Sequence, residues 1–255
     1  MDAIVDSIAI EPASNARTDL AAAYRLLAHM GMDDSIFTHI SAKVGEDERF
    51  LLNSYGTRFD EVKASELVTV DIDGTVLDDP LGHGINAAGF VIHSAVHAAR
   101  PDIGCVLHTH TVAGVAVACL EEGLLPLNQW ALQFHDRIAY HDFEGIAVNP
   151  AERERLVADL GTRKAMVLRN HGLMTCGRTV GEAFVLMHNL ERACQAQIAA
   201  MGTGRPLRLP SRAIADLTAS QYEKWDDLHA ASGLADPEWA AFLRLAAAVA
   251  PDFNH

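Results

Sequence analysis

Apolar and polar positions along the chain follow two periods, 3.6 and 2, which predict a mixture of helices and short strands. The first helical pattern has apolar residues from Leu20 to Leu27, with Gly31 as its stop. Thr18 or Asp19 is the expected N-cap, because a hydroxyl or carboxylate there can accept a hydrogen bond from the first turn.

Three short segments then indicate strands, at residues 37–43, 50–53 and 67–71. They are separated by turn residues, as is typical of hairpins. Asp73-Gly74 follows the third segment and supplies the positive φ angles that a tight hairpin turn requires.

The rest of the chain alternates between the two patterns. We expect helices at residues 86–100, 111–121, 152–160 and 179–201, strands at 103–107, 165–169 and 173–175, and an irregular stretch at 125–145. The last of these helices is expected to begin with a capping box, Thr179-Val-Gly-Glu182. A linker with Gly and Pro then leads to a helical tail over residues 217–249. Short strands mixed with helices on one core predict an α/β domain at 18–201, between a loose arm (1–17) and a linker with helical extension (202–255).

Composition excludes several classes of protein. Hydrophobic residues make up 49% of the chain and charged residues 21%, as expected of a globular fold rather than a disordered chain. The net charge of -14 argues against a nucleic acid or an anionic membrane as partner. It permits a cationic metal and a small-molecule substrate.

The N-terminal segment carries acids and no basic stretch, so we expect no signal peptide. The longest apolar run, residues 112–120, is far shorter than the ~20 residues of a membrane span. The four cysteines form no C-x-x-C pair and are expected to be reduced thiols of a cytoplasmic protein. They are Cys105, Cys119, Cys176 and Cys194.

A His-x-His pair follows the buried strand expected at residues 103–107. In an extended strand, His108 and His110 point to the same side, with their imidazoles about 6–7 Å apart. Two imidazoles at that spacing can chelate one cation. The pair alone is weak evidence, so the metal interpretation depends on a further ligand.

His171 is the candidate third ligand, because it stands where a buried strand gives way to Gly172. Three neutral imidazoles leave one position of a tetrahedral ion open, which is typical of a catalytic site. Structural zinc favours a closed set rich in Cys. His93 and His97, spaced i, i+4 on one helix face, form another possible pair, for which packing or the helix surface is the favoured interpretation.

Several motifs occur in order along the chain, and together they resemble the class II aldolase/adducin family over about residues 20–201. They are Thr38-His-Ile-Ser-Ala-Lys43, Asp71-Ile-Asp-Gly74, Arg100-Pro-Asp102, His108-Thr-His110, Asn170-His-Gly172 and Ala183-Phe184. The resemblance implies a three-layer α/β/α fold with a mainly antiparallel central sheet. It also implies a homotetramer with active sites at subunit interfaces, and metal ligands at His108, His110 and His171.

One departure concerns proton transfer. The sugar-phosphate aldolases of the family carry an acidic residue, which serves as acid/base, four positions before the residue that is His93 here. In this chain that position is Gly89. Proton transfer must then fall to another group, for which Tyr55, His39, His135 and a water at the metal are the candidates.

The positions that hold phosphate in those enzymes are also altered. Where the family has an Asn and serines, this chain has His39, Tyr55 and the pair Ala87-Ala88. Loss of these amide and hydroxyl donors disfavours a phosphate monoester and favours a flatter, apolar or aromatic substrate. The candidate substrate-binding residues are Gly56, Ala87, Ala88, Gly89, Trp130, Phe134, His141 and Tyr222.

Taken with the resemblance, these residues favour an enzyme, a divalent-metal-dependent carbon–carbon lyase of aromatic compound metabolism. It would cleave its substrate by a retro-aldol reaction that releases a small aldehyde, or by decarboxylation. One metal ion per subunit is expected, Zn²⁺ first, with Mn²⁺ or Fe²⁺ next. The motif pattern is closest to the adducin-like branch, so a non-catalytic scaffold is one alternative. An iron-dependent oxygenase on the same three histidines is another.

Overall fold

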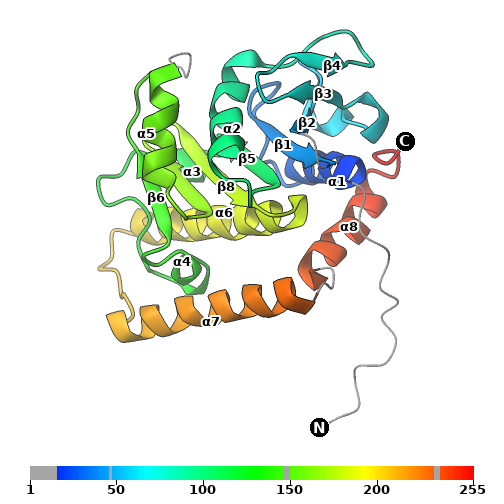
Figure 1. The fold of residues 1–255 in the computed structure, drawn as a ribbon. Helices are drawn as coiled ribbons and strands as arrows, with labels where there is room; N and C mark the ends of the chain where they lie inside the picture. Colours follow the sequence, from blue (N-terminus) through cyan, green and yellow to red (C-terminus); the bar gives the residue numbers. More distant parts are fainter. Residues whose placement is uncertain (1–15, 46–47, 146–149, 233–235) are drawn as a thin grey trace.

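An eight-stranded sheet forms the centre of the molecule, with helices on both faces (Figure 1). The computed structural model describes residues 16–45, 48–145, 150–232 and 236–255. The strands are β1 (His39–Val44), β2 (Arg49–Leu52), β3 (Val68–Asp71), β4 (Val76–Asp78), β5 (Cys105–Thr109), β6 (Ile138–His141), β7 (Ala165–Leu168) and β8 (Gly172–Gly177).

The strand order is β4-β3-β2-β1-β5-β8-β7-β6. Within the described ranges, every neighbouring pair is antiparallel except β6–β7, which is parallel. This confirms the three-layer α/β/α architecture with a mainly antiparallel sheet.

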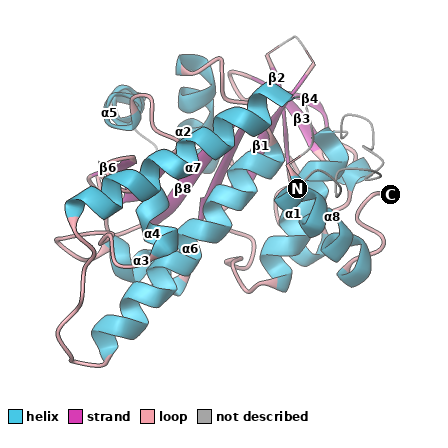
Figure 2. Ribbon diagram, turned by 90° about the horizontal axis from the view of Figure 1, so that it is seen from below, coloured by secondary structure: helices cyan, strands magenta, loops and turns pink. Residues whose placement is uncertain are grey.

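Two helices, α2 (Ala87–Ala99) and α5 (Pro150–Leu160), pack together on one face of the sheet. The opposite face carries α1 (Ala16–His29), α3 (Val112–Ala118), α6 (Val180–Gly202) and α8 (Pro237–Val249). The short α4 (Gln129–Gln133) packs on α6, and α7 (Arg212–Ser232) packs on α4 as an outer layer (Figure 2). Two 3₁₀ turns, η1 (Phe59–Glu61) and η2 (Ala64–Glu66), connect β2 to β3.

The α2/α5 face of the sheet is built from alternate residues of the central strands. Val106 faces Cys176 and His108 faces Met174 across β5 and β8, so these four side chains share one face. Val106 and Met174 belong to a buried apolar cluster that also includes Ile92 of α2. The histidine at 108 therefore stands at the end of an apolar row.

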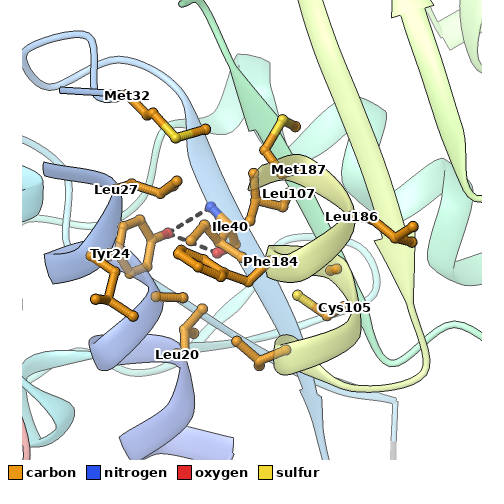
Figure 3. Close-up of a cluster of buried hydrophobic side chains, with 14 of the residues drawn as sticks. Leu20, Tyr24, Leu27, Met32, Ile40, Cys105, Leu107, Phe184, Leu186 and Met187 are labelled. Carbon is orange, nitrogen blue, oxygen red and sulfur yellow. Dashed lines mark hydrogen bonds between the residues drawn. The ribbon is translucent and has the colours of Figure 1, made fainter. Parts of the chain in front are cut away.

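The opposite face forms the larger core, part of which Figure 3 shows around Tyr24. Tyr24 of α1 is completely buried, and its hydroxyl accepts a hydrogen bond from the Ile40 amide at 2.7 Å. The same oxygen lies 2.9 Å from the side-chain oxygen of Asn53 and 2.7 Å from the Ile40 carbonyl. Tyr24 thus ties α1 to the beginning of β1, next to His39.

Three details of the sequence prediction are wrong. Helix α1 begins at Ala16, so Thr18 and Asp19 lie inside it rather than capping it. The stretch at 125–145 is not irregular, because it contains α4 and β6. The tail contains two helices, α7 and α8, and the second has its own N-cap at Asp236.

The capping box expected at the start of α6 is only half formed. Thr179 accepts a hydrogen bond from the amide of Glu182 at 3.1 Å, as predicted. The Glu182 carboxylate accepts from the amide of Arg178 at 2.7 Å instead, and pairs with Lys164. The helix is confirmed, although its N-terminal bonds differ in detail from the motif.

The N-terminal arm predicted for residues 1–17 lies almost entirely outside the described residues. Within the part that is described, no helix is long and apolar enough to span a lipid bilayer. Three of the cysteines are buried thiols and Cys119 is exposed. Burial raises the pKa of Cys176 to about 12, so that thiol stays protonated.

Candidate metal centre

Three imidazoles meet at one end of the sheet. The Nε2 atoms of His108 and His110 lie 2.8 Å apart, and those of His110 and His171 lie 2.9 Å apart. The three rings stand in mutual contact, with centroid separations of 4.6 to 4.8 Å. The structure therefore brings together the three residues that the sequence singled out as metal ligands.

The sheet explains why these residues converge. His108 is near the end of β5, and His110 follows directly where the strand stops. His171 lies in the turn between β7 and β8, where its amide donates to the Leu168 carbonyl at 3.1 Å. Asn170, just before it, has a φ of 56°, a left-handed conformation that Asn tolerates.

Gly172 allows this turn to approach β5. A Cβ at this position would lie 2.3 Å from the Thr109 carbonyl oxygen and 3.3 Å from the ring of His108. Any larger residue would push the β7–β8 turn away from β5. The Gly in Asn170-His-Gly172 is thus a packing requirement of the histidine cluster.

Two hydrogen bonds fix the protonation pattern of the cluster. Nδ1 of His108 donates to the Leu173 carbonyl oxygen, and Nδ1 of His110 donates to the carboxylate of Asp34, both at 2.9 Å. Because both acceptors are oxygen atoms, the proton of each neutral ring resides on Nδ1. The Nε2 lone pairs of these two rings then point toward the shared centre.

Burial keeps the rings of His108 and His171 neutral. It holds the pKa of His108 well below its ordinary value and lowers that of His171 to about 4. Neutral imidazole is the form that binds a metal ion. Ligand nitrogens around a tetrahedral zinc are about 3.3 Å apart, close to the separations seen here. The donor set therefore fits one divalent cation, with the half-buried His110 and His171 on its accessible side.

His39 lies beside the cluster. It is directly opposite His108 in the β1–β5 pairing, with ring centroids 6.4 Å apart. Its side chain is buried, and burial lowers its pKa to about 4. The ring lies against the backbone of Gly89, the position at which the acidic residue is missing.

His93 and His97 pack in the interior of the protein, in agreement with the packing role expected for this pair. His93 is fully buried and its Nδ1 lies 2.7 Å from the Ser41 hydroxyl. Nε2 of His97 lies 2.8 Å from the same hydroxyl. The serine therefore bridges two histidines of α2 to β1.

Further predicted site residues lie in the turn after β2 and in the first turn of α2. Tyr55 is exposed in the turn after β2, where its amide donates to the Gly84 carbonyl at 2.9 Å. Gly56 has a φ of 84° and open space around it. Ala87 and Ala88 form the first turn of α2, and their side chains lie outside what the structure describes.

His135 contacts a different group of residues. It lies 3.1 Å from Asp216 of α7 and 3.7 Å from Asp136. Both carboxylates also pair with Arg212, which already supplies a positive charge there. In the described chain His135 thus connects α4 to α7, and its catalytic role remains a prediction.

The aromatic residues of α4 are divided between core and surface. Phe134 is almost completely buried in the large apolar core rather than at a pocket wall. Trp130 is half-buried beneath the guanidinium of Arg192, 4.8 Å from the ring centre. Tyr222 lines a groove of about 910 Å³ between α4 and α7, together with Trp225.

His141 ends β6 on the same side of the sheet as His108. Its Nδ1 lies 2.8 Å from Asp159, and its Nε2 lies 3.7 Å from the buried Glu152. It lines a crevice of about 10 Å³, the volume of a single water, which His171 also lines. The crevice therefore links His141 to His171 of the cluster, but it is too small to hold a substrate.

The sequence interpretation missed Asp34, the carboxylate that holds His110. It lies 76 residues before its partner, in a short turn bridged to Phe37. Two neighbouring residues in this segment, Ser35 and Thr38, have positive φ angles of 56° and 64°. Strained backbone angles at non-glycine residues are typical of functional sites, but they cannot be read from a sequence.

Comparisons with known proteins agree with this geometry. The family model of the class II aldolase and adducin N-terminal domain matches residues 18–198. A Pseudomonas aeruginosa protein, named provisionally as an aldolase class 2 protein, is 50% identical over 78% of this chain and 77% of its own length. The crystal structure of an aldolase II superfamily protein from Pseudomonas syringae superposes with a TM-score of 0.87 and 48% identity, covering 93% of this chain and 94% of that one.

Adducins are also among the relatives. Mouse alpha-adducin is 44% identical over 76% of this chain. The match covers 27% of the alpha-adducin sequence.

Proposed function

The chain belongs to the class II aldolase and adducin family, and we propose that it is a divalent-metal-dependent carbon–carbon lyase. The observation that carries the proposal is the convergence of three Nε2 atoms on one point, with two of the rings held in the metal-binding tautomer. Without a cation, three lone pairs this close repel one another.

His108, His110 and His171 would hold the ion. Three neutral nitrogen ligands favour Zn²⁺, followed by Mn²⁺ or Fe²⁺. When bound, such an ion acts as a Lewis acid toward a carbonyl, enol or phenolate oxygen of the substrate.

The residues of the chain define the rest of the site. Asp34 and the Leu173 carbonyl orient two ligands from behind, which leaves the accessible side of the cluster for a small molecule. His39 and Tyr55 are the proposed contacts to that molecule, and His39 or Tyr55 is the proposed group for proton transfer. The bond cleaved would be a carbon–carbon bond next to a carbonyl or hydroxyl, by retro-aldol cleavage or decarboxylation.

We further propose that the substrate is not phosphorylated and is flat, apolar or aromatic. The support is chemical: Ala87 and Ala88 bring no hydroxyl groups to the first turn of α2, where an anion would otherwise find donors. A homotetramer would bring Tyr222 of the tail of one subunit near the site of another, as tail tyrosines do in the family, and Trp130 is a further proposed substrate contact.

Metal analysis of the purified protein and of His171→Ala tests the proposal. We expect one divalent ion per subunit in the parent protein, little in the variant, and lyase turnover only in the former. Turnover by a metal-free His171→Ala protein would overturn it. A parent protein that holds iron and consumes oxygen with an aromatic substrate would indicate an oxygenase instead.

The second candidate is a non-catalytic scaffold, which the 44% identity to alpha-adducin favours. A scaffold has no need for a stoichiometric metal ion. Expression in metal-supplemented medium followed by elemental analysis separates the two, because the absence of metal in a folded parent protein supports the scaffold.

A further inference from the structure

The ring of His39 occupies the space that a side chain at position 89 would need. A Cβ built on Gly89 would lie 2.0 Å from Cε1 of His39, and 2.6 Å from each ring nitrogen. Real Cβ atoms do not approach other atoms so closely. The imidazole at 39 and the glycine at 89 therefore depend on each other.

The surroundings hold this ring in one place. On one side it stacks on His93, with centroids 4.0 Å apart, and His93 is itself held by Ser41. The ring of His39 also lies edge-to-face with the ring of His108, a member of the metal cluster, with centroids 6.4 Å apart. His39 thus contacts a buried interior group and lies beside the metal centre.

By hydrogen-bond geometry neither ring nitrogen of His39 has a partner within the described chain, although the backbone of Gly89 and Thr38 lies near enough to oppose part of the lowering of its pKa. The residue is only 4% exposed, and a buried polar atom without a partner is costly. A neutral imidazole offers one donor and one acceptor, and a hydroxyl group offers the same pair in reverse. The ring is therefore suited to a ligand hydroxyl.

We propose that the His39–Gly89 pair determines the ligand preference of the three-histidine centre. The ring of His39 fills the space where α2 would otherwise present a side chain, and from there it hydrogen-bonds a hydroxyl group of a molecule held at the metal. The pair thereby selects hydroxy-substituted carbonyl or carboxylate compounds over their unsubstituted analogues. This inference rests on the proposed metal centre.

Binding of glycolate and acetate to the Co²⁺-loaded protein tests this preference, because the two anions differ by one hydroxyl. Calorimetry and the visible absorption of cobalt report the binding. We expect the parent protein to prefer glycolate, and His39→Ala to lose roughly fivefold in glycolate affinity while its acetate affinity is unchanged. His97→Asn, which alters a buried histidine of α2 that lies against Ser41 rather than at the cluster, should retain the preference.

Equal glycolate affinity in the parent and His39→Ala proteins would overturn the inference and leave the metal centre intact. A parent protein that takes up no cobalt would overturn the metal centre itself. The two failures are therefore distinguishable.

Thermal unfolding tests the dependence between the two positions. Gly89→Ala should lower the melting temperature by about 5 °C in the parent protein, and by much less in a His39→Ala background where the space is free. A Gly89→Ala chain that folds only together with His39→Ala gives the same support. Equal losses in both backgrounds would overturn the steric coupling.

Discussion

The carboxylate of Asp34 lies 2.9 Å from Nδ1 of His110, across 76 residues of sequence. The contact joins a surface turn to the three-histidine cluster. An acceptor behind a ligand histidine fixes the ring orientation and increases the basicity of the nitrogen that faces the metal. Asp34 is therefore part of the centre without touching the ion.

Removing this carboxylate should weaken metal binding without unfolding the protein. For Asp34→Ala we expect Zn²⁺ affinity to fall by about 10- to 100-fold, as measured by competition with a chromogenic chelator. Asp33→Ala is the matched control, because the neighbouring carboxylate has no contact with the cluster among the described residues. Equal affinities in the two variants would show that Asp34 does not support the centre.

Gly172 should be equally sensitive, for a steric reason. Gly172→Ala places a Cβ 2.3 Å from the Thr109 carbonyl, so the turn that carries His171 must move away from β5. We expect lower stability and sub-stoichiometric zinc, measured by thermal unfolding and elemental analysis. Gly161→Ala, at a helix end where the nearest atom would be 3.9 Å away, controls for glycine loss, although its φ of 54° adds some strain. Full zinc content in Gly172→Ala would contradict the packing argument.

Acid should destabilise the protein through its buried histidines. Burial lowers the pKa of His97 from 6.5 to about 4, so the unfolded chain binds a proton between these values and the folded protein does not. Stability from this residue is fully present above pH 6.5 and decreases as pH falls toward 4, by about 3 kcal/mol in total. Urea unfolding at pH 7 and pH 5 should show a smaller loss for His97→Gln than for the parent at equal metal loading. Identical losses would mean that His97 titrates normally in the folded state.

The buried hydroxyl of Tyr24 should contribute to stability. Tyr24→Phe leaves the Ile40 amide and the Asn53 side chain without this partner, which should cost about 1–3 kcal/mol in the free energy of unfolding. Chemical denaturation measures the effect. Tyr222→Phe, in the α4–α7 groove, is a control for the loss of a phenolic oxygen outside the core. If the Tyr24→Phe protein were as stable as the parent, the hydrogen bonds of this hydroxyl between α1 and β1 would contribute nothing measurable to stability.

The elements that carry the cluster could be predicted because their signals are local. The β-branched run before His108 and the Gly after His171 each mark a strand end, and two strand ends can bring both residues to one edge. Strand β6 was not predicted, because it is an edge strand that pairs, within the described residues, with β7 alone. Its pairing is decided by tertiary contacts rather than by its own pattern.

Other features of the site could not be predicted, because they join residues that are far apart in the sequence and close in the folded chain. Asp34, His39 and Gly89 come from three separate segments, and no spacing rule connects them. The sequence suggested His39 as a candidate for proton transfer and showed that the acid is missing at position 89. Only the three-dimensional structure shows that the histidine at 39 and the glycine at 89 are linked, because the ring of His39 fills the space beside Gly89.

The position of β5 in the sheet has a consequence for how the molecule opens. β5 has four strands on one side (β1, β2, β3 and β4) and three on the other (β8, β7 and β6). It therefore lies deep within the sheet, whereas β4 and β6 are the edges. Amide hydrogens of the edge strands should exchange with solvent through local fraying, and those of β5 only when much of the domain unfolds. The histidine cluster is therefore anchored to the slowest-exchanging part of the chain, and brief openings at either edge leave it assembled.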